Sequence, residues 1–88
     1  MLYRCVWKYG PETYQGVSDT NDGKGYKSES AALWHGERLR TRLRRADAEH
    51  IRSCQRKPCA LCGAGIRPLG TLAAEPFYPN TVCVIQDW

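Results

Sequence analysis

Apolar and polar side chains alternate at the start of the chain, over residues 2–9 (LYRCVWKY). One side of this segment carries Tyr3, Cys5, Trp7 and Tyr9. Successive side chains of an extended chain point to opposite faces, so the alternation predicts a β-strand. The turn signal Gly10-Pro11 follows, and residues 12–19 (ETYQGVSD) then predict the returning strand of a hairpin.

A helical pattern begins after the loop at residues 20–25 (TNDGKG). Ser28 or Ser30 can cap the helix, because a short hydroxyl side chain accepts hydrogen bonds from free N–H groups of the first turn. Glu29 adds negative charge near the positive end of the helix dipole. From Ser30 onward no proline occurs until Pro58, and we therefore predict one long helix over roughly 29–53.

Apolar side chains recur along this helix at roughly helical spacing and predict a buried stripe. Its members are Ala32, Leu39, Leu43, Ala46 and His50. Arginines flank the stripe, with Arg38, Arg42, Arg45 and Arg52 on one side and Arg40 and Arg44 on the other. Gly36 lowers the helix propensity by about 1 kcal/mol relative to alanine and predicts a bend.

Residues 54–88 are rich in loop-forming residues, with four of the five prolines and four of the five cysteines. GTLAAE (70–75) and NTVCVIQ (80–86) predict two short strands. The expected fold class is therefore α+β in one small domain, 1–88. It comprises an N-terminal antiparallel β-hairpin or small sheet (1–27), a long basic central helix (28–53) and a C-terminal zinc-ribbon-like module (54–88).

The length of 88 residues allows only a modest hydrophobic core, and small domains often add a disulfide or a metal. The N-terminal MLYRCVWKYG lacks the features of a signal peptide, and no apolar stretch is long enough to span a membrane. We therefore expect a soluble, cytoplasmic protein without a membrane partner. In a reducing compartment, closely spaced cysteines are metal ligands more often than disulfide partners.

The sequence Cys59-Ala-Leu-Cys62-Gly63 has the spacing of a zinc knuckle. In a knuckle, a tight turn brings two thiolates to one ion while backbone N–H groups point at the sulfur atoms. Glycine after the second cysteine accepts a positive φ at no steric cost. We therefore predict that both cysteines bind Zn²⁺ in a structural site.

The two remaining ligands must come from elsewhere in the chain. Cys83 lies 21 positions beyond the knuckle, but a repeated spacing would place the fourth ligand at Gln86, whose amide is a poor zinc ligand. Cys54 can fold back on a short loop and is favoured, with His50 as the alternative fourth ligand or a core residue of the helix. Cys5 is interpreted as a small buried hydrophobic residue. The predicted ligands are Cys54, Cys59, Cys62 and Cys83.

Residues 59–86 (CALCGAGIRPLGTLAAEPFYPNTVCVIQ) resemble the zinc finger of the DksA/TraR family of small bacterial transcription factors. The shared features are the C-x2-C-G knuckle, an isoleucine three residues after that glycine, a proline-containing loop and a final VCV. The last ligand position of the family is cysteine, and in this chain it is Gln86. The resemblance covers about a third of the chain and implies a small bacterial or phage zinc-ribbon protein.

Members of that family look like a helical arm plus a finger, and they enter the secondary channel of RNA polymerase with acidic residues at a helical tip. This chain has a predicted hairpin and a basic helix in place of such an arm. The polymerase-channel mechanism is therefore not carried over from the resemblance.

The net charge of +4 is unevenly distributed. Residues 37–57 contain eight basic side chains against three acidic ones. A local basic surface favours a polyanion or an acidic protein face as partner. The six arginines predicted to bind nucleic acid or a partner are Arg38, Arg40, Arg42, Arg44, Arg45 and Arg52. Trp7 and Trp34 are expected to pack in the core against the helix.

Catalysis has little support in the sequence. The sequence contains no Ser/His/Asp arrangement and no phosphate-binding glycine loop. It also gives no indication of a small-molecule substrate. We therefore expect a non-enzymatic zinc-binding regulatory protein that binds nucleic acid or a transcription-linked machine. The alternative is a phage-type inhibitor or adaptor that docks on a host protein, such as a polymerase or a defence nuclease, without binding nucleic acid itself.

Overall fold

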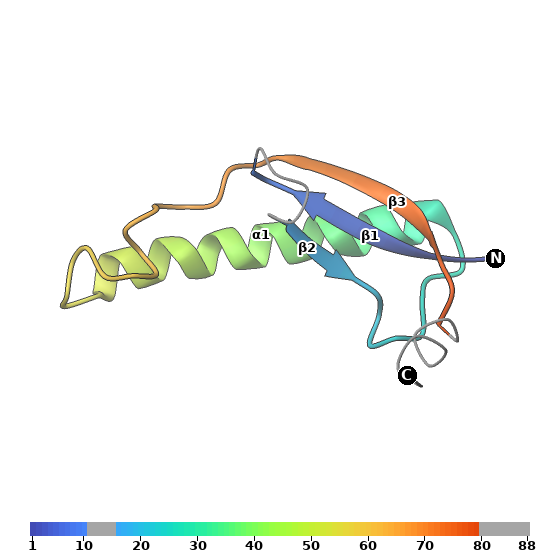
Figure 1. The fold of residues 1–88 in the computed structure, drawn as a ribbon, viewed down its shortest axis with the longest axis horizontal. Coiled ribbons are helices and arrows are strands. Elements are labelled where there is room, and N and C mark those ends of the chain that lie inside the picture. The colour runs from blue at the N-terminus through green and yellow to red at the C-terminus, as the bar shows by residue number, and fades with distance from the viewer. Residues whose placement is uncertain (11–15, 80–88) are drawn as a thin grey trace, which may run out of the picture.

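The computed structural model describes residues 1–10 and 16–79 (Figure 1). The elements in these ranges are the strands β1 (Leu2–Lys8), β2 (Gly16–Asp19) and β3 (Thr71–Phe77) and the helix α1 (Glu29–Ser53). The strands form an antiparallel sheet in the order β2-β1-β3, and α1 packs against one face of it. The predicted α+β fold class is confirmed.

The alternation of β1 places the side chains of Cys5 and Trp7 in the core. Cys5 and Trp7 are each only 1 % exposed, and Cys5 packs with Tyr26 and Ala32. The indole N–H of Trp7 donates a hydrogen bond of 2.9 Å to the carbonyl of Leu69. The interpretation of Cys5 as a buried hydrophobic residue is therefore confirmed, as is the core position of Trp7.

The predicted hairpin is present as the pairing of β1 with β2, in which Trp7 lies opposite Val17. Residues 11–15 of the predicted second strand lie outside the described residues. The strand predicted at 70–75 corresponds to β3, and it pairs with β1, Cys5 lying opposite Ala74. The C-terminal region thus completes the N-terminal sheet, while the strand predicted at 80–86 lies outside the described residues.

Helix α1 has the bounds that the sequence predicts. Ser28 caps it, since its Oγ accepts a hydrogen bond of 3.1 Å from the N–H of Ala31. The helix continues through Gly36, which is buried where α1 meets β1. A Cβ at this position would overlap the Sγ of Cys5, so the absence of a side chain lets helix and strand approach closely.

The predicted apolar stripe of α1 is only partly correct. Ala32 is buried and Leu39, Leu43 and His50 are half-buried, but Ala46 is exposed. The buried face is shifted away from Ala46 because the helix is covered by the sheet over its first half and by a different segment over its second half (Figure 1). This face also includes Gly36, Arg40, Arg44 and Asp47.

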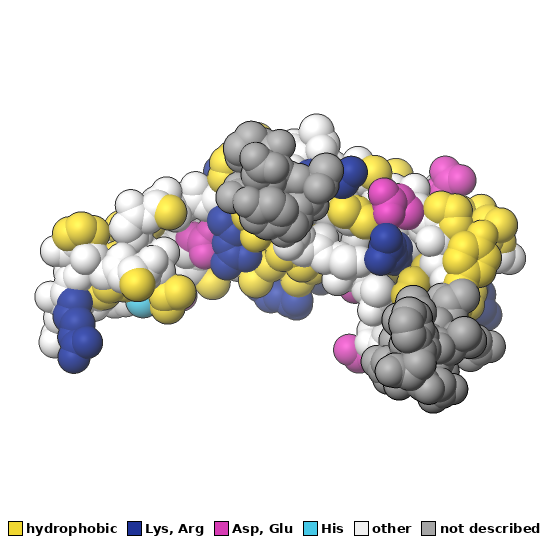
Figure 2. All heavy atoms as spheres, in the orientation of Figure 1, with side chains coloured by type: hydrophobic (Ala, Val, Ile, Leu, Met, Phe, Trp, Pro, Cys, Tyr) yellow, Lys and Arg dark blue, Asp and Glu magenta, His cyan; other side chains and the backbone are white. Residues whose placement is uncertain are grey.

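The segment that covers the second half of α1 comprises residues 54–70 and is called the strap. The C-terminal end of α1 extends beyond the sheet, and the strap turns there and runs back along the helix to β3 (Figure 1). Figure 2 shows this end standing away from the body of the molecule. In the part of the chain that the structure describes, no helix combines the length and apolar character that crossing a bilayer requires.

Candidate functional site

A cluster of four metal-ligating side chains lies where α1 meets the strap. His50 and Cys54 lie four residues apart, at the end of the helix, and therefore share one face. Cys59 and Cys62 come from the turn of the strap. The four ligand atoms all lie within 4.8 Å of one another.

The distances inside this cluster are those of groups that converge on one point. The Nε2 of His50 lies 3.1 Å from the Sγ of Cys59, which lies 3.2 Å from the Sγ of Cys62. A tetrahedral zinc ion with Zn–S bonds of about 2.3 Å separates its ligand atoms by about 3.7 Å. Small side-chain adjustments therefore suffice to admit an ion. Cys54, Cys59 and Cys62 are free thiols.

The backbone of the strap turn supports the two knuckle cysteines. The N–H of Cys62 donates to the Sγ of Cys59 at 3.3 Å, and the N–H of Gly63 donates to the carbonyl of Cys59 at 2.9 Å. The predicted orientation of backbone N–H groups toward sulfur is confirmed. The predicted positive φ at Gly63 is wrong, because the positive φ in this turn belongs to Gly65. A Cβ at Gly63 would lie 2.9 Å from the carbonyl oxygen of Cys59, so close approach accounts for this glycine.

The Cys59 thiol is prepared for metal binding. A hydrogen bond with His50, together with contributions from the backbone N–H and side chain of Cys62, lowers the pKa of Cys59 to about 6. The thiolate is the metal-binding form of cysteine, and it therefore predominates at Cys59 at neutral pH.

Three thiols and one imidazole can hold a metal ion. Cys54, Cys59 and Cys62 of the predicted ligand set belong to the cluster, together with His50, the alternative ligand. His50 is half-buried and in contact with Cys59, so it is not a residue of the apolar core. Cys83 lies outside the described residues. Cys5 lies in the core on β1, where burial raises the pKa of its thiol.

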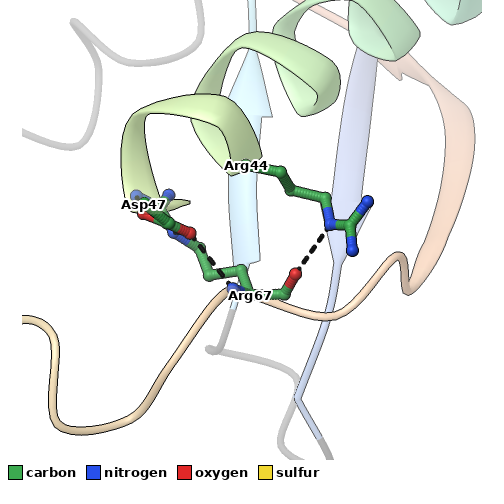
Figure 3. A network of polar contacts seen from close by, with 3 residues as sticks. All are labelled: Arg44, Asp47 and Arg67. Carbon is green, nitrogen blue, oxygen red and sulfur yellow. Dashed lines mark hydrogen bonds and ion pairs between the residues drawn. The ribbon is translucent and has the colours of Figure 1, made fainter. Parts of the chain in front are cut away.

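A second connection between α1 and the strap lies next to the cluster. The guanidinium of Arg67 donates hydrogen bonds of 3.0 and 2.9 Å to the two carboxylate oxygens of Asp47 (Figure 3). The backbone N–H of Arg67 donates a third, of 3.1 Å. Burial alone would raise the pKa of Asp47, but these hydrogen bonds outweigh it and hold the pKa below its usual range. Sequence reasoning did not single out this pair, whose members lie 20 positions apart.

Two of the six predicted binding arginines also hold the strap. The Nε of Arg44 donates a hydrogen bond of 2.9 Å to the carbonyl of Arg67 (Figure 3). Arg40 donates one of 3.2 Å to the carbonyl of Leu69. Arg40 and Arg44 therefore lie on the strap side of the helix and act within the chain, separately from the other four.

Arg38, Arg42 and Arg45 lie on the opposite, solvent-facing side of α1. With Trp34, they line a shallow groove of about 750 Å³. Within the described residues, no carboxylate forms an ion pair with any of these three arginines. Arg52 lies two turns beyond Arg45, is exposed and continues the same side of the helix.

The predicted core position of Trp34 is wrong. Its side chain is 54 % exposed, and the guanidinium of Arg38 lies 4.7 Å from its ring centroid. The sheet packs on the other side of α1, so position 34 faces solvent. We define the exposed face of α1 by Trp34, Arg38, Arg42 and Arg45.

Comparison with known proteins gave no match: no family model fits the sequence, and no curated protein or solved structure is significantly similar to it. The resemblance of residues 59–86 to the DksA/TraR zinc finger therefore stays a prediction.

Proposed function

We propose that His50, Cys54, Cys59 and Cys62 bind one structural Zn²⁺ ion. The convergence of their four ligand atoms within 4.8 Å carries this proposal. Three cysteines and one histidine are a common donor set of closed, tetrahedral zinc sites, and thiolate ligands favour zinc over magnesium or calcium.

The ion would tie the end of α1 to the strap. This end of the helix lies beyond the sheet, where packing against β-strands does not stabilise it (Figure 1). The knuckle residue Leu61 is 80 % exposed and therefore adds little apolar burial at this end. Metal binding supplies folding free energy at such a site, because the ligands are brought together only in the folded chain.

Titration of the metal-free protein with Co²⁺ tests the proposal. A tetrahedral site with three thiolates gives intense visible and sulfur-to-cobalt absorption bands. We expect these bands to saturate at one Co²⁺ per chain and to disappear when Zn²⁺ is added. A spectrum of octahedral, water-coordinated Co²⁺ would contradict the proposal.

We further propose that the protein is a non-enzymatic regulatory protein that binds nucleic acid through the exposed face of α1. The observation that carries this proposal is the row formed by Arg38, Arg42 and Arg45 beside Trp34, on the side of the helix opposite the sheet. Arginine side chains in such a row suit phosphate oxygens, and the nearby aromatic ring suits a base.

Salt dependence tests this second proposal. We expect affinity for nucleic acid to fall steeply between about 50 and 200 mM salt, because phosphate contacts release counterions. Replacing Arg42 with glutamine should reduce the slope of log K against log salt by about 0.7 to 0.9. Replacing Arg44 with glutamine is the matched control and should leave the slope unchanged, since Arg44 binds the carbonyl of Arg67.

A protein partner is the second candidate. Leu61 in the knuckle is 80 % exposed, and Ile66 and Leu69 of the strap are also exposed. Apolar side chains gathered on one segment are typical of protein-binding surfaces. A protein that binds no nucleic acid even at low salt would favour this candidate, with a host polymerase or nuclease as the type of partner.

A further inference from the structure

We infer that the exposed face of α1 binds single-stranded nucleic acid, with one base stacked on Trp34 and the adjoining phosphates on Arg38, Arg42 and Arg45. This inference rests on the proposed nucleic-acid function and names its ligand class.

The spacing of the four residues arranges them in one row. Positions 34, 38, 42 and 45 are separated by three or four residues, so they lie on the same side of the helix. With a rise of 1.5 Å per residue, Arg38 and Arg42 are about 6 Å apart along the helix axis. The row therefore presents an aromatic ring at one end and three guanidinium groups in succession after it.

The ring of Trp34 is held in place and is accessible. The ring of His35 lies edge-on to it, with centroids 4.8 Å apart at 87°. His35 is itself stacked on Tyr26, which hydrogen-bonds to Asp19 on β2. Trp34 is thus positioned through a chain of aromatic contacts to the sheet. Trp34 is 54 % exposed and the guanidinium of Arg38 lies over its ring, so the two side chains together offer both contacts that a nucleotide uses, namely base stacking and phosphate binding.

Acidic side chains limit what the arginines can achieve alone, and two of them, Asp19 and Asp22, line a hollow together with Arg38 and Arg42. Glu37 and Glu49 line the same groove as Arg38, Arg42 and Arg45. They reduce its positive potential, so phosphate contacts by themselves give weak binding, and stacking on Trp34 must add to it. The bases of a duplex are stacked on one another and paired inside the helix, whereas a single strand presents its base faces. The combination therefore favours a single strand.

Fluorescence anisotropy with end-labelled oligonucleotides of about 12 nucleotides tests the inference. The probes are a single strand, its duplex, and a strand of the same length made of abasic sites. The variants are Trp34→Ala and Trp34→Phe, the second of which keeps an aromatic ring. Because Trp34 is exposed, neither variant removes core packing.

We expect the single strand to bind more tightly than the duplex or the abasic strand. Trp34→Ala should weaken binding of the single strand by about five- to a hundredfold, and Trp34→Phe by much less. Binding of the abasic strand should be the same for wild type and Trp34→Ala. Glu49→Gln should strengthen binding of all three probes, because it removes a negative charge from the groove.

The outcomes separate the inference from the proposed function. Salt-dependent binding in which the duplex is bound as tightly as the single strand, or in which Trp34→Ala has no effect, overturns the inference and leaves phosphate binding intact. Absence of binding to every probe at low salt overturns both.

Discussion

Arg67 and Asp47 form a bidentate ion pair, in which the guanidinium donates hydrogen bonds of 3.0 and 2.9 Å to the two carboxylate oxygens. The pair joins the end of the strap nearest β3 to α1, and the candidate metal centre joins the turn of the strap to the end of the same helix. Both connections lie in a part of the molecule that the sheet does not cover. With an ion bound, the two connections would fix the second half of α1, on whose outer side Arg42, Arg45 and Arg52 lie.

Replacing Asp47 with asparagine should destabilise the folded protein. It leaves the half-buried guanidinium of Arg67 without a charged acceptor, and we expect a loss of about 1 to 3 kcal/mol in the free energy of unfolding. Urea denaturation of the zinc-loaded protein measures this loss in the free energy of unfolding. Glu49→Gln, an exposed change on the same helix, is the control and should stay within about 0.5 kcal/mol of wild type. Equal midpoints for the two variants would contradict a stabilising role of the pair.

The same pair gives stability a defined pH dependence. The pKa of Asp47 is lower in the folded chain than the value of about 3.9 expected in the unfolded chain. Its contribution is therefore fully present above pH 3.9 and is lost as the pH falls through the folded value. We expect the difference in stability between wild type and Asp47→Asn, both metal-free, to shrink as the pH is lowered from 6 to about 3. A difference that stays constant over this range would exclude Asp47 as its origin.

Gly36→Ala should destabilise the protein although alanine is the better helix former. The added Cβ would overlap the Sγ of Cys5, and forced overpacking of this kind costs about 1 to 3 kcal/mol. Thermal or urea unfolding measures the loss. In a Cys5→Ala background the sulfur is absent, but the Cβ of residue 5 still lies 2.8 Å from the added Cβ, so the same change should cost less without becoming neutral. Additive effects of the two substitutions would show that the contact is not the cause.

Single substitutions distinguish the ligands of the metal. We expect His50→Ala and Cys54→Ser to weaken zinc binding strongly, because each removes one of four converging donors. Competition with a chromophoric chelator measures the affinity. Cys83→Ser should bind zinc as wild type does. Loss of affinity in Cys83→Ser together with full affinity in His50→Ala would instead support a ligand set of four cysteines.

Local signals predicted much of the fold. The bounds of α1 follow from the capping serine Ser28 and a run without proline, and the alternation of β1 identified Cys5 and Trp7 as buried. The knuckle at Cys59 and Cys62 was recognisable from spacing alone. Each of these features depends on residues within a few positions of one another, where periodicity and turn chemistry decide the structure.

The remainder depends on contacts between distant parts of the chain. The pairing of β3 with β1 decides which side of α1 is covered, and only this covering shows that Trp34 and Ala46 face solvent. The Asp47–Arg67 pair spans 20 positions, so no local pattern indicates it. His50 has the spacing both of an apolar stripe and of a ligand one turn before Cys54, and the position of the strap distinguishes the two.

The central claim is that a zinc ion fixes the strap turn to the end of α1. Elemental analysis of protein purified without added metal, combined with amide hydrogen exchange before and after chelation, tests it most directly. We expect one zinc per chain, and faster exchange after chelation over residues 50–66, with β1 and β3 unchanged. A folded protein that contains no metal, and whose exchange over residues 50–66 is the same with and without chelator, would contradict the claim.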